Sequence, residues 1–197
     1  MAYNKFTVQQ VIKSFNLNLI ENEMLFKDVS LITPSLLLSQ LMKKYLPLAH
    51  AIGTEKARSE FIIAPILAEL TEITEHSISL FSGINFTVDK QHGLSGRCDF
   101  LISASPIQYN LTAPILAIVE AKNDNINNGL GQCMAEMVAA QMFNQQEGKE
   151  RIIYGTVSTG SAWHFLKLEQ NNLYIDKQTY FIDSLELLLG VLCEIVS

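Results

Sequence analysis

The chain has 197 residues, of which 48% are hydrophobic and 17% charged, with five prolines and ten glycines. This composition excludes a disordered or fibrous chain, and the length is sufficient for a sizeable hydrophobic core. Fourteen Lys and Arg against twenty Asp and Glu give a net charge of −6, which argues against a protein that grips nucleic acid through its overall charge. A local basic groove is still compatible with this total.

The sequence predicts neither a membrane segment nor an export signal. The longest apolar stretches, such as Phe61–Ala68, are much shorter than the roughly 20 residues that cross a bilayer. The first residues lack the apolar run and the cleavage site of a secretory signal. Cys98, Cys133 and Cys193 form no CxxC pair, so we expect reduced thiols in a cytoplasmic protein with no membrane partner.

The first third of the chain has helical patterns. Residues 7–15 are predicted to form a short amphipathic helix. Thr33-Pro34 is typical of a helix start, with a capping residue followed by proline at the first helical position. Thr54 is predicted to cap a third helix that reaches about residue 73 and is kinked at Pro65.

The middle of the chain changes to strand patterns around one long helix. Residues 115–119 are continuously apolar, as expected for a central strand covered on both faces. A stretch rich in Ala and Met predicts a helix over about 130–146. Further strands are predicted at 77–81, 84–88, 96–102, 152–157 and 162–168, the last two as a hairpin.

This order of elements predicts an α/β or α+β fold with a mixed central sheet flanked by helices. We expect a single domain with an N-terminal helical extension at 1–53, a core at 54–168 and a C-terminal strand and helix at 169–197. The last helix, predicted over 182–196, is apolar on nearly every side. Homodimerisation through this helix and burial inside the monomer both explain that pattern.

The residues that indicate chemistry are Asp99, Glu120 and Lys122. Glu120 and Lys122 come at the end of the apolar strand, and their spacing of two puts both side chains on one face. An Asp from a neighbouring strand would add a second carboxylate to the same pocket. Two carboxylates and water suit Mg²⁺ or Mn²⁺, and an ammonium group stabilises an attacking water or the charge on a phosphate.

With these residues, the sequence resembles the PD-(D/E)xK nuclease superfamily, which has the restriction-endonuclease-like fold. The matching residues are Asp99 followed by Glu120-Ala121-Lys122. The stretch 154–165 is similar to the T-x-G…W-x-F hairpin of many restriction-type nuclease domains. One departure is Cys98, which stands where the family name has proline.

The resemblance implies a metal-dependent nuclease that hydrolyses phosphodiester bonds, with DNA as the expected substrate and Mg²⁺ or Mn²⁺ as the cofactor. Asp99 and Glu120 would bind the metal with the Ala121 carbonyl. Lys122 would orient the water or help to deprotonate it, and would screen charge in the transition state. Members of the superfamily often add a helical glutamate before the sheet and a glutamine after the lysine. These two are expected here at Glu60, as ligand to a second metal or its water, and at Gln132, which would position Lys122 or a phosphate.

Ordinary structural roles, on the surface or in the core, are alternatives for several of these residues. Lys90 and Arg97 precede Asp99 and could contact a phosphate backbone. Gln132 and Glu136 share one helix face, and an exposed polar stripe explains them as well as a site does. Trp163 and Phe165 of the hairpin are expected in the core.

Two other functions compete with the nuclease. A nuclease fold without catalytic activity, acting in binding or assembly, would agree with the net charge of −6. A small-molecule enzyme that uses the acidic residues for other metal chemistry is a weaker alternative, because the sequence has no phosphate loop, GxGxxG motif or nucleophile elbow.

Overall fold

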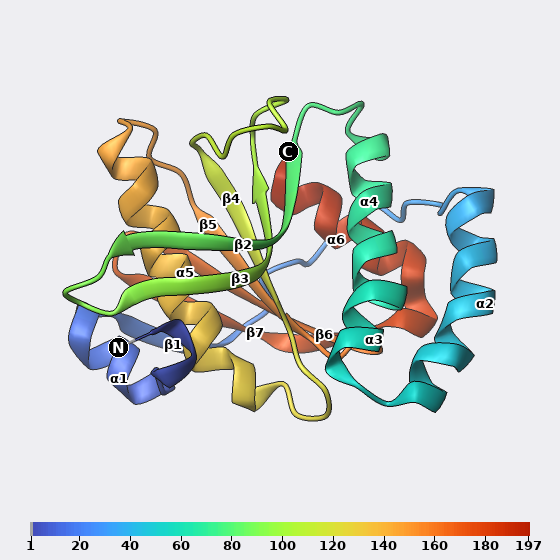
Figure 1. Ribbon diagram of the computed structural model, residues 1–197, viewed down its shortest axis with the longest axis horizontal. Coiled ribbons are helices and arrows are strands. Elements are labelled where there is room, and N and C mark those ends of the chain that lie inside the picture. Colours follow the sequence, from blue (N-terminus) through green and yellow to red (C-terminus); the bar gives the residue numbers. More distant parts are fainter. Residues whose placement is uncertain (1) are drawn as a thin grey trace.

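A mixed sheet of seven strands runs through the molecule in the order β1-β7-β6-β5-β4-β3-β2 (Figure 1). The structure is a computed structural model that describes residues 2–197. The strands are β1 (Asn18–Glu23), β2 (Ser79–Asp89), β3 (Leu94–Ser103), β4 (Ile115–Ala121), β5 (Ile153–Ser158), β6 (Ala162–Glu169) and β7 (Asn172–Phe181). The helices are η1 (Tyr3–Lys5), α1 (Val8–Phe15), α2 (Leu36–Ile52), α3 (Glu55–Arg58), the π-helical turn η2 (Ser59–Ile63), α4 (Ala64–Ile73), α5 (Asn127–Gln146), η3 (Ile182–Ser184) and α6 (Leu185–Val196).

The strand directions confirm the predicted mixed α/β sheet. Strands β2, β3 and β4 are antiparallel neighbours, and α5 then crosses over so that β5 lies parallel to β4. Strands β5, β6 and β7 are again antiparallel. Strand β1 forms one edge of the sheet and pairs parallel with β7. One face packs against α5, α1 and η1, whereas α2, α4 and α6 contribute to the core on the other face. All residues of β4 are buried, as predicted for a central strand.

The sequence prediction was wrong for part of the N-terminal segment. Helix α1 agrees with the prediction, and Thr7 and Gln10 form its capping box. Asn18–Glu23, however, is the strand β1 rather than part of a helical extension. Its partner β7 lies about 150 residues further along the chain, with Asn18 Nδ2 donating to Asn172 Oδ1 at a sequence separation of 154. Such a distant pairing leaves no local pattern in the sequence.

Helix α2 begins two residues later than predicted. Its cap is Ser35, whose Oγ accepts from the Leu38 amide at 3.1 Å, and Thr33-Pro34 precedes the helix. The Glu69 carboxylate accepts from the Ser35 amide at 2.7 Å and from its hydroxyl at 2.9 Å. This contact with α4 explains why Ser35, and not Thr33, is the N-cap of α2.

The predicted kink near Pro65 takes the form of the π-helical turn η2. The Thr54 cap is confirmed, since Thr54 Oγ1 accepts from the Ala57 amide at 3.2 Å. At the end of the turn the Ala64 amide donates to the Ser59 carbonyl. Pro65, the next residue, has no amide hydrogen, so the helix is irregular directly before it.

The two strands predicted on either side of Gly83 are one continuous strand, β2. The ladder with β3 pairs Ser82 with Phe100 and Ile84 with Cys98, so the strand pairing continues past Gly83 in the same register. Its φ of +62° is a backbone conformation that glycine adopts without strain.

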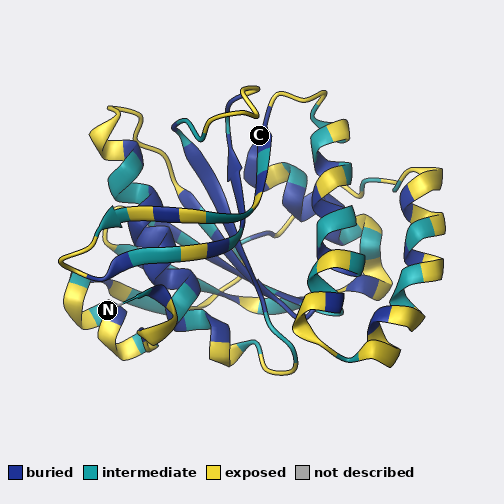
Figure 2. Ribbon diagram, viewed as in Figure 1, coloured by how far each residue is buried: buried dark blue, intermediate teal, exposed yellow. Residues whose placement is uncertain are grey.

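The apolar sequences of the β5–β6 hairpin and of α6 are explained by their burial in the core (Figure 2). Trp163 and Phe165 are fully buried, which confirms that they belong to the core. Helix α6 buries most of its residues in the same core, so packing inside the monomer explains its apolar faces. Along residues 2–197, every helix is too short or too polar to span a membrane.

Candidate functional site

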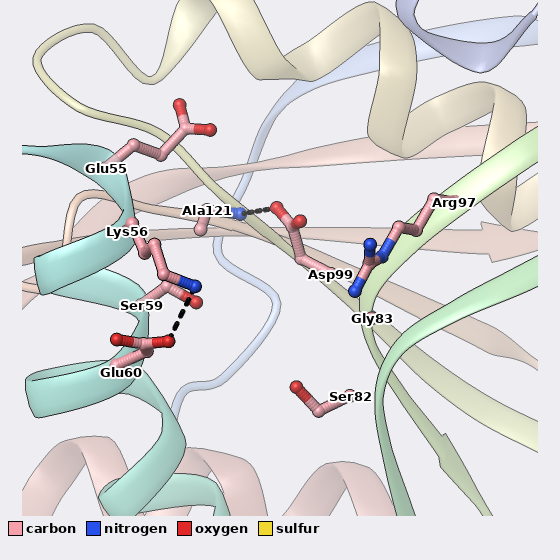
Figure 3. A pocket seen from close by; sticks show the side chains of 9 residues that line it. All are labelled: Glu55, Lys56, Ser59, Glu60, Ser82, Gly83, Arg97, Asp99 and Ala121. Atoms are coloured by element: carbon pink, nitrogen blue, oxygen red, sulfur yellow. Dashed lines mark hydrogen bonds and ion pairs between the residues drawn. The ribbon is translucent and has the colours of Figure 1, made fainter.

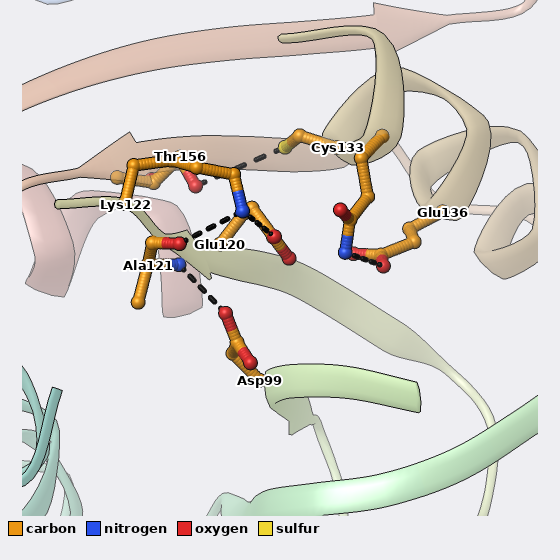
Figure 4. Close-up of polar contacts among 8 residues, drawn as sticks. Asp99, Glu120, Ala121, Lys122, Cys133, Glu136 and Thr156 are labelled. Carbon is orange, nitrogen blue, oxygen red and sulfur yellow. Dashed lines mark hydrogen bonds and ion pairs between the residues drawn. The ribbon is translucent and has the colours of Figure 1, made fainter. Parts of the chain in front are cut away.

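Strands β3 and β4 bring Asp99 and Glu120 together. Their antiparallel register pairs Phe100 with Val119, and the next pair in this register would be Asp99 and Glu120. Asp99 Oδ2 accepts a hydrogen bond from the Ala121 amide at 2.9 Å (Figure 4). The Asp99 carboxylate is therefore held against the end of β4.

Lys122 follows β4 directly and turns back over it. Its amide donates to the Ser158 carbonyl of β5 at 2.8 Å, which continues the strand pairing by one residue. Its ammonium group donates to Glu120 Oε1 and, at 3.0 Å, to the Ala121 carbonyl. The side chain of Lys122 is 16% exposed and that of Glu120 2%. The three charged residues singled out from the sequence thus converge at one place.

Two neighbouring cavities open at these residues. The inner cavity, of about 360 Å³, is lined by Ala2, Tyr3, Asn4, Glu55, Gly96, Arg97, Asp99, Glu120, Lys122 and Gln132. The outer cavity, of about 400 Å³, is lined by Glu55, Lys56, Ser59, Glu60, Ser82, Gly83, Arg97, Asp99 and Ala121 (Figure 3). Asp99, Arg97 and Glu55 line both, so the two cavities meet at Asp99.

Gln132 lies in the inner cavity, and Glu136 is buried behind it. Gln132 Nε2 donates to Glu136 Oε1 at 3.1 Å. Glu136 is 0% exposed, so the interpretation of these residues as an exposed polar stripe was wrong. Helix α5 approaches its neighbours closely at its glycines: a Cβ at Gly131 would lie 2.2 Å from the Phe6 carbonyl oxygen. This close packing places Glu136 in the interior.

The remaining predicted residues lie at different distances from the two cavities, some lining them and some outside them. Arg97 lines both cavities. Glu60 lies only in the outer cavity, where its Oε1 is 2.8 Å from Lys56 Nζ and its side chain is 53% exposed. Lys90 is exposed in the turn after β2 and lines neither cavity. That Lys90 contacts a phosphate backbone stays a prediction, and such a contact would lie outside the two cavities.

Tyr3 and Glu55 line the inner cavity and Glu136 lies behind Gln132, but none of them was predicted as a site residue. Glu136 was interpreted as one of a polar pair with Gln132. Tyr3 lies in the N-terminal segment, is 1% exposed and packs its ring where a Cβ on Gly96 would lie 2.8 Å from Cδ2. The one available signal was the spacing of four between Gln132 and Glu136, which put both on the same side of α5.

Burial dominates the electrostatics of the carboxylates. Burial and then the charge of Asp99 raise the pKa of Glu120 to about 8, although Lys122 opposes the rise. Burial, followed by the charge of Glu120, raises the pKa of Glu136 well above its usual value. Burial disfavours the charged form of Lys122, but its carboxylate neighbours, Glu120 first, outweigh burial and raise its pKa. Lys122 is therefore an ammonium ion at neutral pH.

The donor atoms at β3 and β4 suit a hard divalent cation. Asp99, Glu120 and the Ala121 carbonyl supply only oxygen, which Mg²⁺ and Mn²⁺ prefer. Glu120 Oε2 is buried and has no hydrogen-bond partner. Within residues 2–197, no cluster of three or more His, Cys, Asp or Glu side chains is placed to bind a metal. A cation here would therefore be held by two carboxylates, one carbonyl and water.

The chain was compared with protein-family models and with curated proteins. No family model matches it. No curated protein matches it either.

Proposed function

We propose that this protein is a divalent-metal-dependent nuclease of the PD-(D/E)xK type, with the restriction-endonuclease-like fold and DNA as its substrate. The observation that carries the proposal is the convergence of Asp99, Glu120 and Lys122 on one cavity at the end of two adjacent strands. A mixed sheet flanked by helices agrees with the fold that the sequence resemblance implies.

The two carboxylate oxygens of Glu120 have different roles in the proposed site. Oε1 accepts from the Lys122 ammonium group, and Oε2 has no partner in the structure. Oε2 would hold Mg²⁺ or Mn²⁺ together with Asp99 and the Ala121 carbonyl. A bound metal supplies a Lewis acid and lowers the pKa of a coordinated water.

Lys122 acts on the water and the phosphate. Its ammonium group, held over the end of β4 by Glu120 and the Ala121 carbonyl, can hydrogen-bond a water in the inner cavity. The same positive charge stabilises the negative charge that develops on the phosphate in the transition state. A lysine that is an ammonium ion at neutral pH suits this role better than that of a general base.

Arg97 is the residue best placed to bind a substrate phosphate. It lines both cavities beside Asp99, and no hydrogen bond or ion pair engages its guanidinium in the part of the chain that the structure describes. Glu60 contacts Lys56 through Oε1, so Oε2 is the oxygen that would hold a second metal or its water. Gln132 faces the inner cavity with its amide nitrogen already bonded to Glu136.

The proposal is tested by cleavage assays on plasmid, linear duplex and single-stranded DNA and on RNA, with Mg²⁺ or Mn²⁺. Asn at position 99 can still accept from the Ala121 amide, so Asp99→Asn should keep the fold while it removes a metal ligand. We expect cleavage to fall at least about 100-fold. Asp124→Asn, which changes an exposed carboxylate that follows the neighbouring strand β4, is the matched control. Absence of cleavage on all four substrates, with no metal binding by calorimetry, would refute the nuclease.

The alternative of a silent nuclease fold is favoured by one observation. The Lys122 ammonium group donates to Glu120 Oε1 and to the Ala121 carbonyl, so its charge has partners within the chain itself. That alternative predicts that Glu120→Ala leaves every biological effect of the folded protein unchanged. Loss of such an effect, with the fold retained by circular dichroism, would exclude it.

A further inference from the structure

Among residues 2–197, the most exposed large apolar side chains apart from one tyrosine lie on the segment formed by residues 31–37, where the chain enters α2. Leu31, Leu36 and Leu37 are 63%, 76% and 65% exposed. Large apolar groups are seldom left in water together unless a partner covers them. None of these leucines lines the inner or the outer cavity.

The segment is held rigidly by its neighbours on both sides. The Ile32 amide donates to the Glu186 carbonyl of α6 at 3.0 Å. Ser35 donates to both oxygens of Glu69 on α4. The leucines are therefore presented by a backbone that is fixed before any partner arrives, which reduces the entropy cost of binding.

Two grooves flank this segment. The larger, which we call the Leu37 groove, lies between α2 and α4 and has a volume of about 720 Å³, with Leu37, Leu41, Pro65 and Ile73 among its apolar walls. The second, of about 570 Å³, lies between Leu31 and the start of α6. In Figure 1 α2 and α4 lie beside each other at one end of the molecule, and Figure 2 shows the outer side of α2 exposed.

Charge identifies the kind of partner. The charged residues that line the two grooves are Glu69 and Glu72 in the Leu37 groove and Asp183 and Glu186 in the second, all of them acidic. An anionic membrane or a nucleic acid would be repelled by these carboxylates. A second copy of the chain that used the same face would place acidic residues against acidic residues, and like charges across an interface are costly.

We propose that the Leu37 groove binds an amphipathic helix of another protein, with leucine-like side chains on one face and Lys or Arg beside them. Helix-in-groove binding uses apolar anchors spaced by three and four residues, which suits a groove between two helices. The basic residues would lie against Glu72 and the acidic rim. This inference does not depend on the nuclease proposal.

A synthetic peptide of 18 residues provides the probe, with Leu on one helical face and Lys elsewhere. Its affinity for the full chain is measured by fluorescence anisotropy, and the binding site is mapped from backbone amide shifts in NMR. Leu37→Ser removes an exposed anchor, and Glu72→Lys reverses a rim charge that is paired with His76. We expect each to weaken binding at least tenfold. Ile107→Ser and Glu147→Lys are the matched controls, because both residues are exposed elsewhere, and they should leave the affinity within about twofold.

Several outcomes would overturn the proposal. One is equal binding of a Leu/Glu peptide, and another is equal weakening by the control variants. A dimer in sedimentation that Leu37→Ser dissociates would assign the surface to a second copy instead. Binding to phosphatidylserine vesicles that Leu37→Ser abolishes would assign it to a membrane. No peptide binding at millimolar concentration would also reject it, since an exposed preformed groove of this size should bind the probe.

Discussion

The guanidinium of Arg97 on β3 occupies the space that a side chain on Gly83 of β2 would fill. A Cβ at Gly83 would lie 2.5 Å from Arg97 Nη2, which is closer than two such atoms can approach. Gly83 also has a φ of +62°, where residues with a Cβ are strained. The glycine therefore determines where the Arg97 side chain can lie beside Asp99.

Gly83→Ala is expected to weaken nucleic-acid binding by displacing Arg97 from the cavities. Gly148→Ala is the control for backbone strain, because Gly148 has a φ of +67° but a Cβ there would contact nothing within 4 Å. Both should lose about 1 kcal/mol of stability. Only Gly83→Ala should reduce the affinity for a DNA duplex in a gel-shift assay. Equal affinities of the two variants would show that Arg97 does not bind the phosphate backbone.

Stability without divalent metal should fall as the pH rises. The pKa values of Glu120, about 8, and Glu136 are raised in the folded state, so the folded chain holds protons that the unfolded chain releases above about pH 4.5. This stabilising contribution is complete below the unfolded pKa and is lost as the pH passes the folded pKa. Urea denaturation in EDTA between pH 5 and 9 measures it, in a range where each pKa unit is worth about 1.4 kcal/mol.

Glu136→Gln should flatten this pH dependence and make the metal-free protein more stable at pH 8 to 9. The amide keeps the size of the side chain and removes the buried charge. Glu147→Gln, at the exposed end of the same helix, should leave the wild-type slope unchanged. A wild-type stability that is constant or rises over this range would contradict the raised pKa values.

Removal of Lys122 should destabilise the protein because it leaves Glu120 buried without a cation. Breaking a buried ion pair costs about 3–5 kcal/mol, and for Lys122→Met the loss should grow above pH 8, where Glu120 ionises. The double variant Lys122→Met/Glu120→Gln should recover most of the loss. Lys167→Met is the control: Lys167 and Glu169 have the same spacing of two on β6, 3.3 Å apart, but are more exposed. It should cost less than about 1 kcal/mol.

Asn144 is expected to be a major stabilising residue outside the site. It is fully buried on α5, where its Oδ1 accepts from the Ile115 amide at 2.7 Å and its Nδ2 donates to the Ile115 carbonyl at 2.8 Å. Asn144→Ala would leave both groups of Ile115 without partners, at a cost of about 2–5 kcal/mol. Urea denaturation should show this loss, whereas Gln145→Ala, at an exposed neighbour, should change stability by less than about 0.5 kcal/mol.

The parts of the fold that were predictable are those whose pattern is local. The continuous apolar run of β4 and the β5–β6 hairpin are encoded in short stretches of sequence, and so is the Thr54 cap. Strand β1 was missed because its partner β7 is far away in sequence. The start of α2 was misplaced because the contact between Ser35 and Glu69 joins two helices.

Of the candidate site, only the residues on or next to β3 and β4 could be predicted, because they belong to local strand patterns. Strand periodicity placed Glu120 and Lys122 on one face at the end of β4, and the family resemblance singled out Asp99, which lies on the adjacent strand β3. Glu136 and Tyr3 reach the same place through the packing of α5 and the N-terminal segment on the sheet. That packing depends on close approaches at Gly131 and Gly96, which have no periodic signature.

The parallel pairing of β1 with β7 also determines the order in which the chain can assemble during synthesis. The residues proposed for chemistry are encoded before residue 137, and β5, which neighbours β4, follows soon afterwards. Strand β1 leaves the ribosome early but has no neighbour in the sheet until residues 172–181 have been translated. One border of the sheet is thus exposed for most of translation, and a nascent chain stalled before β7 would present β1 unprotected to other chains.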